Sequence, residues 1–266
     1  MPAIKPARLK IQVVEIMELF DAPDKFLRAL HDLLGFYADR TRRFGRVVKS
    51  APLLDSYQVP KQVLRQIELS LSPKVLADSD AAVELADRLW DDGWLETRLL
   101  AISVLGQVSP LPPERVSDRV QMWGQACKEE LVMKSLVSKG LEKLRLDARG
   151  YYFESVENWL LSPHQSLVLV GLRALPPLLD DDNFENLPLV FRWLAPLARD
   201  AGIEVRNDLI QVLRSLARRS PQETAYFLRK IKATASSPRS VAMIIRRSLD
   251  AFPADVQSVL RDVLRT

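Results

Sequence analysis

The sequence predicts an all-α protein in which antiparallel helix pairs repeat along the chain. Leucine-rich segments with apolar residues three and four positions apart run through most of its 266 residues, whereas alternating strand patterns are scarce. Proline and glycine mark the ends of these segments at intervals that suit helical hairpins. Because a helical hairpin cannot bury its apolar face alone, stacked copies of it are the expected architecture.

The clearest helix pair lies between Leu89 and Leu105. Leu89 and Trp90 end one predicted helix, and a tight turn containing Gly93 leads into the next. Ala101 stands on the second helix where the two backbones must approach closely, which a small side chain permits. The two helices are therefore expected to pack antiparallel.

In the N-terminal half, helix boundaries follow from prolines and capping residues. Pro23 suits a first helical turn, and the helix that it starts ends in a basic cluster at 40–49. Ser79 and Asp80 are expected to cap the helix that precedes Gly93, and prolines within 110–113 mark a connector. Apart from the helix pair around Gly93, the helices of this half are expected at residues 9–20, 23–44, 60–70, 114–125 and 127–145.

In the C-terminal half, glycine and proline again punctuate the helices. Gly150 is expected to break the chain before a short helix, and Pro221 and Pro238 each stand in a first helical turn. Gly171 takes the same close-packing place as Ala101. The helices of this half are expected at residues 151–161, 165–179, 185–199, 203–218, 221–232, 238–250 and 254–264.

The second helices of these pairs recur at a regular interval. Their centres are separated by roughly 31 to 39 residues, which is the range of two-helix repeats. The centres lie near Ala101, Val132 to Ser135, Gly171, Ile210 and Ile245. We therefore predict an α-α superhelix: a right-handed superhelical solenoid of about six HEAT-like antiparallel helix pairs, whose second helices line the concave side.

Composition excludes several classes of protein. A single cysteine rules out an internal disulfide framework, and with only two histidines we expect no metal site and no cofactor. No apolar run approaches the roughly 20 residues of a membrane span, and no apolar segment follows the basic N-terminus as in a signal peptide. We therefore expect a cytoplasmic protein without a membrane partner, associated with the nucleoid if it binds DNA.

Charge is unevenly placed along the chain. The formal net charge is +4, but residues 199–266 carry 13 Lys and Arg against 7 Asp and Glu. Such a local excess favours a polyanion at short range, although a solvated basic surface would have the same composition. Both interpretations stay open on charge alone.

Three segments carry motifs with apolar and small residues at fixed helical spacing. They are Tyr57-Gln58-Val59-Pro60 with Leu64-Arg65; Leu89-Trp90 with Glu96, Ala101 and Leu105; and Val212-Leu213-Arg214 with Ala217, Ser220 and Pro221. Their order and separation over residues 57–230 resemble the HEAT-like DNA alkylation repair family, the AlkD-type DNA glycosylases. By this resemblance, residues 57–232 form the AlkD-like core of a single domain over 1–266, with capping helices at 1–50 and a C-terminal cap at 238–266.

The resemblance implies a protein that holds duplex DNA in a basic concave cleft and hydrolyses the N-glycosidic bond of alkylated bases. Family members use aromatic residues against the damaged nucleotide and a carboxylate that supports the developing sugar cation. A cationic leaving base needs little acid assistance, so electrostatic support of an oxocarbenium-like state is the main catalytic task.

The sequence departs from the family at its catalytic positions. Where the family has a tryptophan and an aspartate one turn apart, this chain has Trp123 and Cys127, and Glu129 and Glu130 follow in a different helical phase. The family's arginine falls near Leu169, one turn before Arg173, and its late tryptophan falls at Gln211. Trp123, Glu129 and Glu130 are the remaining catalytic candidates.

Basic residues on the predicted concave helices are the candidate DNA contacts. If they converge on one face they form a stripe that follows phosphates without reading sequence; otherwise they are scattered surface charges. They are Arg98, Lys128, Lys134, Arg173, Arg206, Arg214, Arg239, Arg246 and Arg247.

Other prominent side chains have simpler interpretations. The five tryptophans are expected mainly to pack in the core, with Trp123 the best candidate for contact with a nucleotide. Glu96 is expected to cap a first helical turn or to pair with an arginine, with a catalytic role as the alternative. Cys127 is expected to be a buried small residue, and neither His31 nor His164 has an evident role.

These observations favour a DNA-binding HEAT-like repeat protein whose partner is duplex DNA, either undamaged or alkylated or otherwise damaged. One alternative is an active alkylpurine DNA N-glycosylase that uses a relocated carboxylate such as Glu129 or Glu130. Another is a scaffold that binds a protein partner and no nucleic acid.

Overall fold

The structure, a computed structural model, describes residues 5–39, 54–200 and 202–265. These residues are helical almost throughout and contain no strand, apart from an isolated β-bridge between Asp55 and Trp94. The prediction of an all-α protein built from successive helices is confirmed. The chain forms two compact units, Met1–Tyr152 and Phe153–Thr266, so the expected core and caps within one domain stay a prediction.

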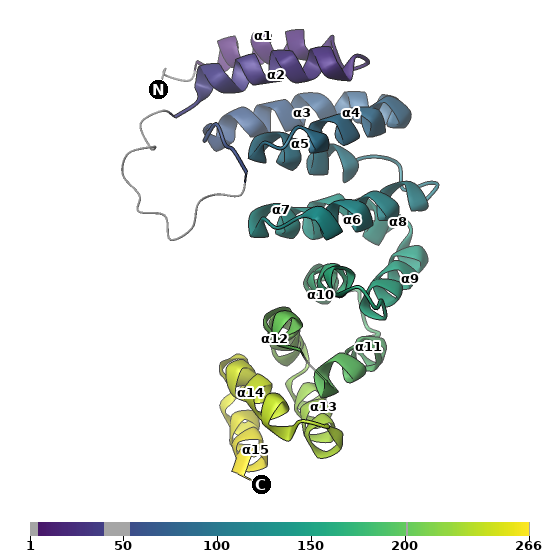
Figure 1. The fold of residues 1–266 in the computed structure, drawn as a ribbon, viewed down its shortest axis with the longest axis vertical. Coiled ribbons are helices and arrows are strands. Elements are labelled where there is room, and N and C mark those ends of the chain that lie inside the picture. The colour runs from purple at the N-terminus through teal and green to yellow at the C-terminus, as the bar shows by residue number, and fades with distance from the viewer. Residues whose placement is uncertain (1–4, 40–53, 201, 266) are drawn as a thin grey trace. The chain divides into compact units, whose positions relative to one another are not determined.

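The first unit is a stack of helices (Figure 1). Its helices are α1 (Pro6–Met17), α2 (Pro23–Tyr37), α3 (Lys61–Ala77), α4 (Ser79–Asp91), α5 (Leu95–Leu105), α6 (Glu114–Ala126), α7 (Glu130–Ser135) and α8 (Glu142–Asp147), and α9 (Arg149–Leu160) leads into the second unit. Alternate helices pack on one another: α1 on α3, α3 on α5 and α5 on α7, with α2 on α4 beside them. This alternation is the packing of a two-helix repeat.

The N-terminal pair α1 and α2 covers one end of this stack. Figure 1 shows both helices alongside α3 and α4, and the buried stripe of α3 consists of Val63, Ile67, Leu71 and Val75, each 0% exposed. Helix α2 begins at Pro23 as predicted and ends at Tyr37. The predicted continuation of this helix to residue 44 is wrong, because Ala38 leaves the helical conformation with a ψ of 136°. The basic cluster at 40–49 lies outside the described residues.

The predicted turn between the helices of the central pair is confirmed. Gly93 has a φ of 81°, a left-handed backbone conformation that suits glycine, and the antiparallel helices α4 and α5 pack closely with Ala101 fully buried. The cap of α4 is Asp78 instead of Ser79 or Asp80, because its carboxylate accepts from the amides of Asp80 and Ala81 at 3.0 Å.

The helix expected over 9–20 lies at Pro6–Met17, and two further predictions in this unit are wrong. Helix α3 continues past residue 70 to Ala77, with Pro73 on its exposed side, where water can satisfy the freed carbonyl. The helix expected over 127–145 is interrupted: α7 begins at Glu130, residues Leu136–Gly140 form a π-helical turn, and α8 follows. A Cβ on Gly106 would collide with the Lys139 carbonyl oxygen, so this wide turn packs directly against the end of α5.

The second unit has two ranks of helices. Its helices are α10 (Gln165–Leu179), α11 (Leu187–Arg199), α12 (Ile203–Arg219), α13 (Pro221–Thr234), α14 (Pro238–Ser248) and α15 (Ala254–Arg265), with a 3₁₀ turn at Leu249–Ala251. Helices α10, α12 and α14 pack in one rank, and α11, α13 and α15 in the other. The predicted helices of this half are all present, and α10 covers the predicted residues.

The close-packing role predicted for Gly171 is confirmed. A Cβ there would lie 2.9 Å from Cγ of Leu160 and 3.1 Å from its backbone nitrogen, so α9 and α10 approach closely at this point. Gly150, in contrast, does not break the chain. It lies within α9, which begins at Arg149.

Candidate nucleic-acid interface

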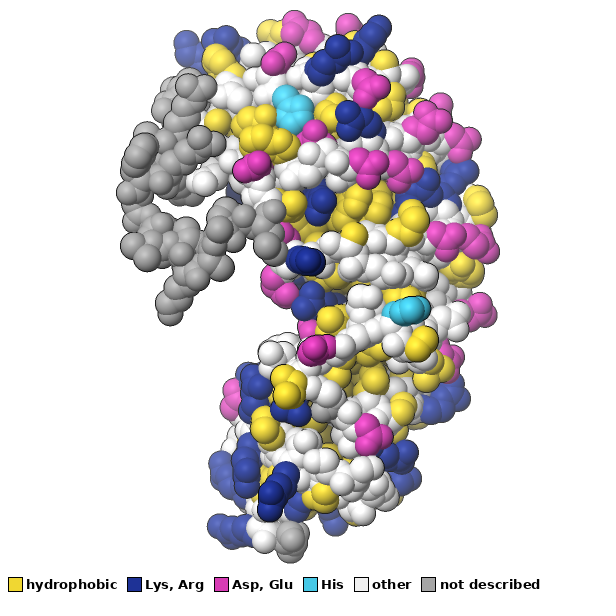
Figure 2. All heavy atoms as spheres, in the orientation of Figure 1, with side chains coloured by type: hydrophobic (Ala, Val, Ile, Leu, Met, Phe, Trp, Pro, Cys, Tyr) yellow, Lys and Arg dark blue, Asp and Glu magenta, His cyan; other side chains and the backbone are white. Residues whose placement is uncertain are grey.

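The most basic helix of the second unit is α14. It carries Arg239, Arg246 and Arg247 but no Asp or Glu, and all three arginines are exposed. Arg239 and Arg246 have no ion-pair partner in the part of the chain that the structure describes. In Figure 2, dark-blue Lys and Arg side chains gather on the part of this unit around α14 and α15.

Polar contacts between α12 and α14 bring three of the predicted arginines together. Arg247 donates from Nη1 to Oδ1 of Asn207 at 2.9 Å, and Arg206 Nη1 lies 3.6 Å from the sulfur of Met243. Arg214 donates to the Arg247 carbonyl at 3.2 Å. Arg206, Arg214 and Arg247 therefore line the edge along which the two helices meet.

Two predicted arginines are compensated by carboxylates. Arg214 donates to both oxygens of Asp250, at 2.9 and 2.7 Å. Arg173 on α10 donates from Nε to Asp208 on α12 at 2.7 Å, and both side chains are mostly buried, at 22% and 17% exposed. The Arg173–Asp208 pair joins α10 to α12, and the positive charge of Arg173 is balanced by this carboxylate.

The other three predicted contacts lie in the first unit. Lys128, before α7, and Lys134, on α7, are exposed. Arg98 places its guanidinium 4.8 Å from the centroid of the Trp90 ring and donates to the Trp90 carbonyl at 3.3 Å. Arg98 therefore packs against the aromatic core of its own helix pair.

The catalytic candidates do not surround an open aromatic site. Trp123 is 4% exposed and lies flat on Trp90, whereas Glu130 is exposed and Glu129 is half-buried. Cys127 is also half-buried instead of fully buried as expected, and its thiol donates to the Glu129 carbonyl at 3.4 Å.

Core packing is confirmed for four of the tryptophans. The exposed fractions are 6% for Trp90, 4% for Trp123, 3% for Trp159 and 2% for Trp193. Trp94 is half-buried and stacks on the ring of Tyr57, with centroids 4.1 Å apart and planes at 18°.

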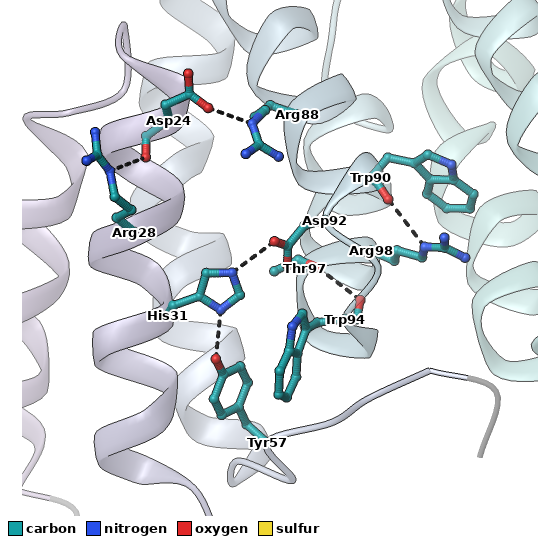
Figure 3. A network of polar contacts seen from close by, with 10 residues as sticks. All are labelled: Asp24, Arg28, His31, Tyr57, Arg88, Trp90, Asp92, Trp94, Thr97 and Arg98. Atoms are coloured by element: carbon teal, nitrogen blue, oxygen red, sulfur yellow. Dashed lines mark hydrogen bonds and ion pairs between the residues drawn. The ribbon is translucent and has the colours of Figure 1, made fainter. Parts of the chain in front are cut away.

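Sequence reasoning did not find a polar cluster around His31, which Figure 3 shows between α2 and the turn that follows α4. His31 Nε2 lies 2.9 Å from Oδ1 of Asp92, and its Nδ1 lies 2.8 Å from the Tyr57 hydroxyl. Burial raises the pKa of Tyr57, and the negative charges of Asp92, Glu96 and Asp32 raise it further. No local pattern marks this cluster, since its partners lie 26 and 61 residues from His31.

Glu96 does not cap its own helix or pair with an arginine, so that expectation is wrong. Its buried carboxylate accepts from the Ser56 hydroxyl at 2.8 Å and from the amides of Tyr57 and Gln58 at 3.2 and 2.8 Å. Gln58 has a φ of 54°, a conformation that this anchorage holds in place. Glu96 thus fixes the segment that precedes α3.

Comparisons with known proteins agree with this architecture. The sequence profile described as "DNA alkylation repair enzyme" matches residues 54–243. No curated protein has significant sequence similarity to the chain.

Two solved structures share the fold. They are AlkD2 from Streptococcus mutans and smu.31 from Streptococcus mutans UA159. Each has a TM-score of 0.56 and 15% identity over 73% of this chain and 99% of its own. Helical-repeat fold and profile match together lead to one conclusion: the chain belongs to the DNA alkylation repair enzyme family.

Proposed function

We propose that this protein binds duplex DNA, whether intact, alkylated or otherwise damaged, through the basic face formed by α12 and α14. Membership of a DNA alkylation repair family supports DNA as the partner. The charge of the two helices supports the place, since α12 and α14 together carry 7 Arg against 2 Asp and Glu.

The observation that carries the proposal is the pair Arg239 and Arg246. They are seven residues apart on α14, so they lie on one face, separated by about 10 Å along the helix axis. Neither is held by a carboxylate among the described residues, so both guanidinium groups are available for phosphates. Arg247, whose Nη1 is bonded to Asn207, adds a third positive charge beside them.

The test is a titration of a fluorescently labelled duplex by anisotropy at several salt concentrations. We expect the double variant R239Q/R246Q to bind about tenfold more weakly than the unchanged protein, with the salt slope reduced by about two. The matched control is K10Q/K25Q, which removes the same charge from exposed positions on α1 and α2. Equal losses in the two double variants would mean that net charge, and not this face, attracts DNA.

Release of alkylated bases through Glu129 or Glu130 stays a prediction, as does a scaffold function. Single-turnover excision of methylated purines, with protein in excess, tests the first. A rate equal to spontaneous release would end that hypothesis. Failure of duplex binding even at low salt would leave the scaffold function as the remaining candidate.

A further inference from the structure

A cavity of about 650 Å³ lies at the turn between α13 and α14, against the end of α15. This volume is within the range of small-molecule sites. Its walls combine an aromatic ring with positive charge: Tyr226, Arg229, Lys230 and Lys232 of α13, Pro238 of α14 and Val263 of α15. Most of the lining residues belong to α13, which packs in the rank of α11 and α15, and only Pro238 belongs to α14. The cavity is therefore a different site from the α12–α14 face proposed above.

The aromatic wall is Tyr226. Its side chain is large, yet the residue is 66% exposed, and its ring stacks on no other ring among the described residues. Arg229 and Lys230 follow three and four positions later on α13, so they lie on the same side of the helix as Tyr226. An exposed flat ring therefore stands beside two cations.

Little negative charge opposes these cations. Arg229 and Lys230 have no ion-pair partner in the described part of the chain, whereas Lys232 donates to the Val263 carbonyl. Two carboxylates are close in sequence to residues that line the cavity: Glu223 lies one turn before Tyr226, and Asp262 precedes Val263 on α15 and lies 3.3 Å from Arg265. The cavity wall is therefore basic.

The start of α14 adds to this positive field. Pro238 is in its first turn, which contains no acidic residue, and Pro238 also lines the cavity. The hydroxyl of Ser237 bonds to Oγ of Ser240 at 3.1 Å and makes no cap to the helix amides. The positive end of the helix dipole is thus not compensated by a cap side chain.

We propose that this cavity binds an unpaired nucleotide, with its base stacked on Tyr226 and its phosphate held by Arg229 and Lys230. A flat apolar ring beside cations is the combination with which proteins bind single-stranded nucleic acid, because every base has a face that can stack. Bases inside a duplex are already stacked on their neighbours, so the ligand is an unpaired base. The inference goes beyond duplex binding and does not depend on it.

The experiment uses the full chain, a labelled (dT)12 strand, dTMP and a labelled duplex. Y226L is expected to bind (dT)12 about tenfold more weakly, in line with the stacking energy of one base, and to bind duplex as the unchanged protein does. Y226F keeps the ring and is expected to restore binding. R229Q/K230Q is expected to weaken (dT)12 binding and to reduce its salt slope by about 1.4.

The arms of the test have separate meanings. Competition by dTMP that depends on Tyr226 identifies a free nucleotide as a ligand, whereas Tyr226-dependent binding of (dT)12 alone identifies a strand. Unchanged affinity of Y226L for both probes, or no binding of either probe by the unchanged protein at low salt, overturns the inference. If duplex binding fails while (dT)12 still requires Tyr226, only the proposed function fails.

Discussion

The indole ring of Trp123 lies flat against that of Trp90, with centroids 4.5 Å apart and planes at 5°. This stack joins α4 to α6 within the first unit, and Arg98 of α5 lies over the Trp90 ring as well. The tryptophan that the family resemblance placed nearest to a catalytic position is thus part of the packing between helices.

Replacing Trp123 with Leu is expected to reduce the free energy of unfolding by about 3 kcal/mol, because it removes buried aromatic surface and leaves a cavity. Duplex affinity of the folded variant should be unchanged. Urea denaturation and anisotropy measure the two effects, and M122L, at an exposed neighbouring position, is the control. Weaker binding without loss of stability would instead make Trp123 a ligand contact.

Glu96 offers a second test. In E96Q one of the two carboxylate oxygens becomes an amide donor, which faces the backbone N–H of either Tyr57 or Gln58, so we expect a loss of about 2 kcal/mol in the free energy of unfolding. E84Q, an exposed change on α4, should leave the unfolding midpoint unchanged. Equal midpoints for the two variants would show that anchorage of residues 56–58 contributes nothing to stability.

Gly150 of α9 and Gly171 of α10 allow the same substitution to be compared in open and in close-packed surroundings. G171A places a Cβ about 3 Å from Leu160 and is expected to cost about 1–3 kcal/mol. G150A meets nothing within 4 Å and is expected to be neutral or to stabilise the protein by up to about 1 kcal/mol. Thermal denaturation measures both, and a G171A variant as stable as G150A would contradict the close approach of the helices.

Alkaline pH should destabilise the protein through Tyr152. Burial raises the pKa of this phenol above its ordinary value of 10.0, against the opposing effect of Arg145. Above about pH 10 the unfolded chain releases this proton while the folded chain keeps it, so stability falls as pH rises.

The variant Y152F lacks the ionisable hydroxyl. Its free energy of unfolding should therefore fall less steeply with pH than that of the unchanged protein, by about 1.4 kcal/mol per pH unit. Urea unfolding midpoints between pH 9 and 11 give the two slopes. Parallel slopes for the variant and the unchanged protein would contradict a raised pKa at Tyr152.

Local signals predicted the fold better than the site. Helix α10 was predictable because a Ser-Pro turn precedes it and an acidic turn follows it, and Gly171 was predictable from its place in the repeat. The break in 127–145 was not, because the π-helical turn packs against Gly106, more than 30 residues earlier. The spacing of apolar residues along the sequence does not indicate that contact.

The partners of charged side chains were equally hidden. Glu96 binds amides about 38 residues earlier, and His31 bonds to residues 26 and 61 positions away. The arginines on α12 and α14 could be identified by type and helical position. The carboxylates that compensate Arg173 and Arg214 could not, because Asp208 and Asp250 lie on other segments of the repeat.

The packing of the N-terminal helices bears on how far the chain can be truncated without loss of the fold. The family match begins at residue 54, yet α1 packs on α3, α2 packs on α4, and His31 bonds to Asp92. A chain shortened to the matched region would keep every family motif but uncover an apolar stripe and remove the partner of a largely buried carboxylate. We expect such a fragment to self-associate. We therefore expect that the residues matched by the family model do not fold independently of α1 and α2.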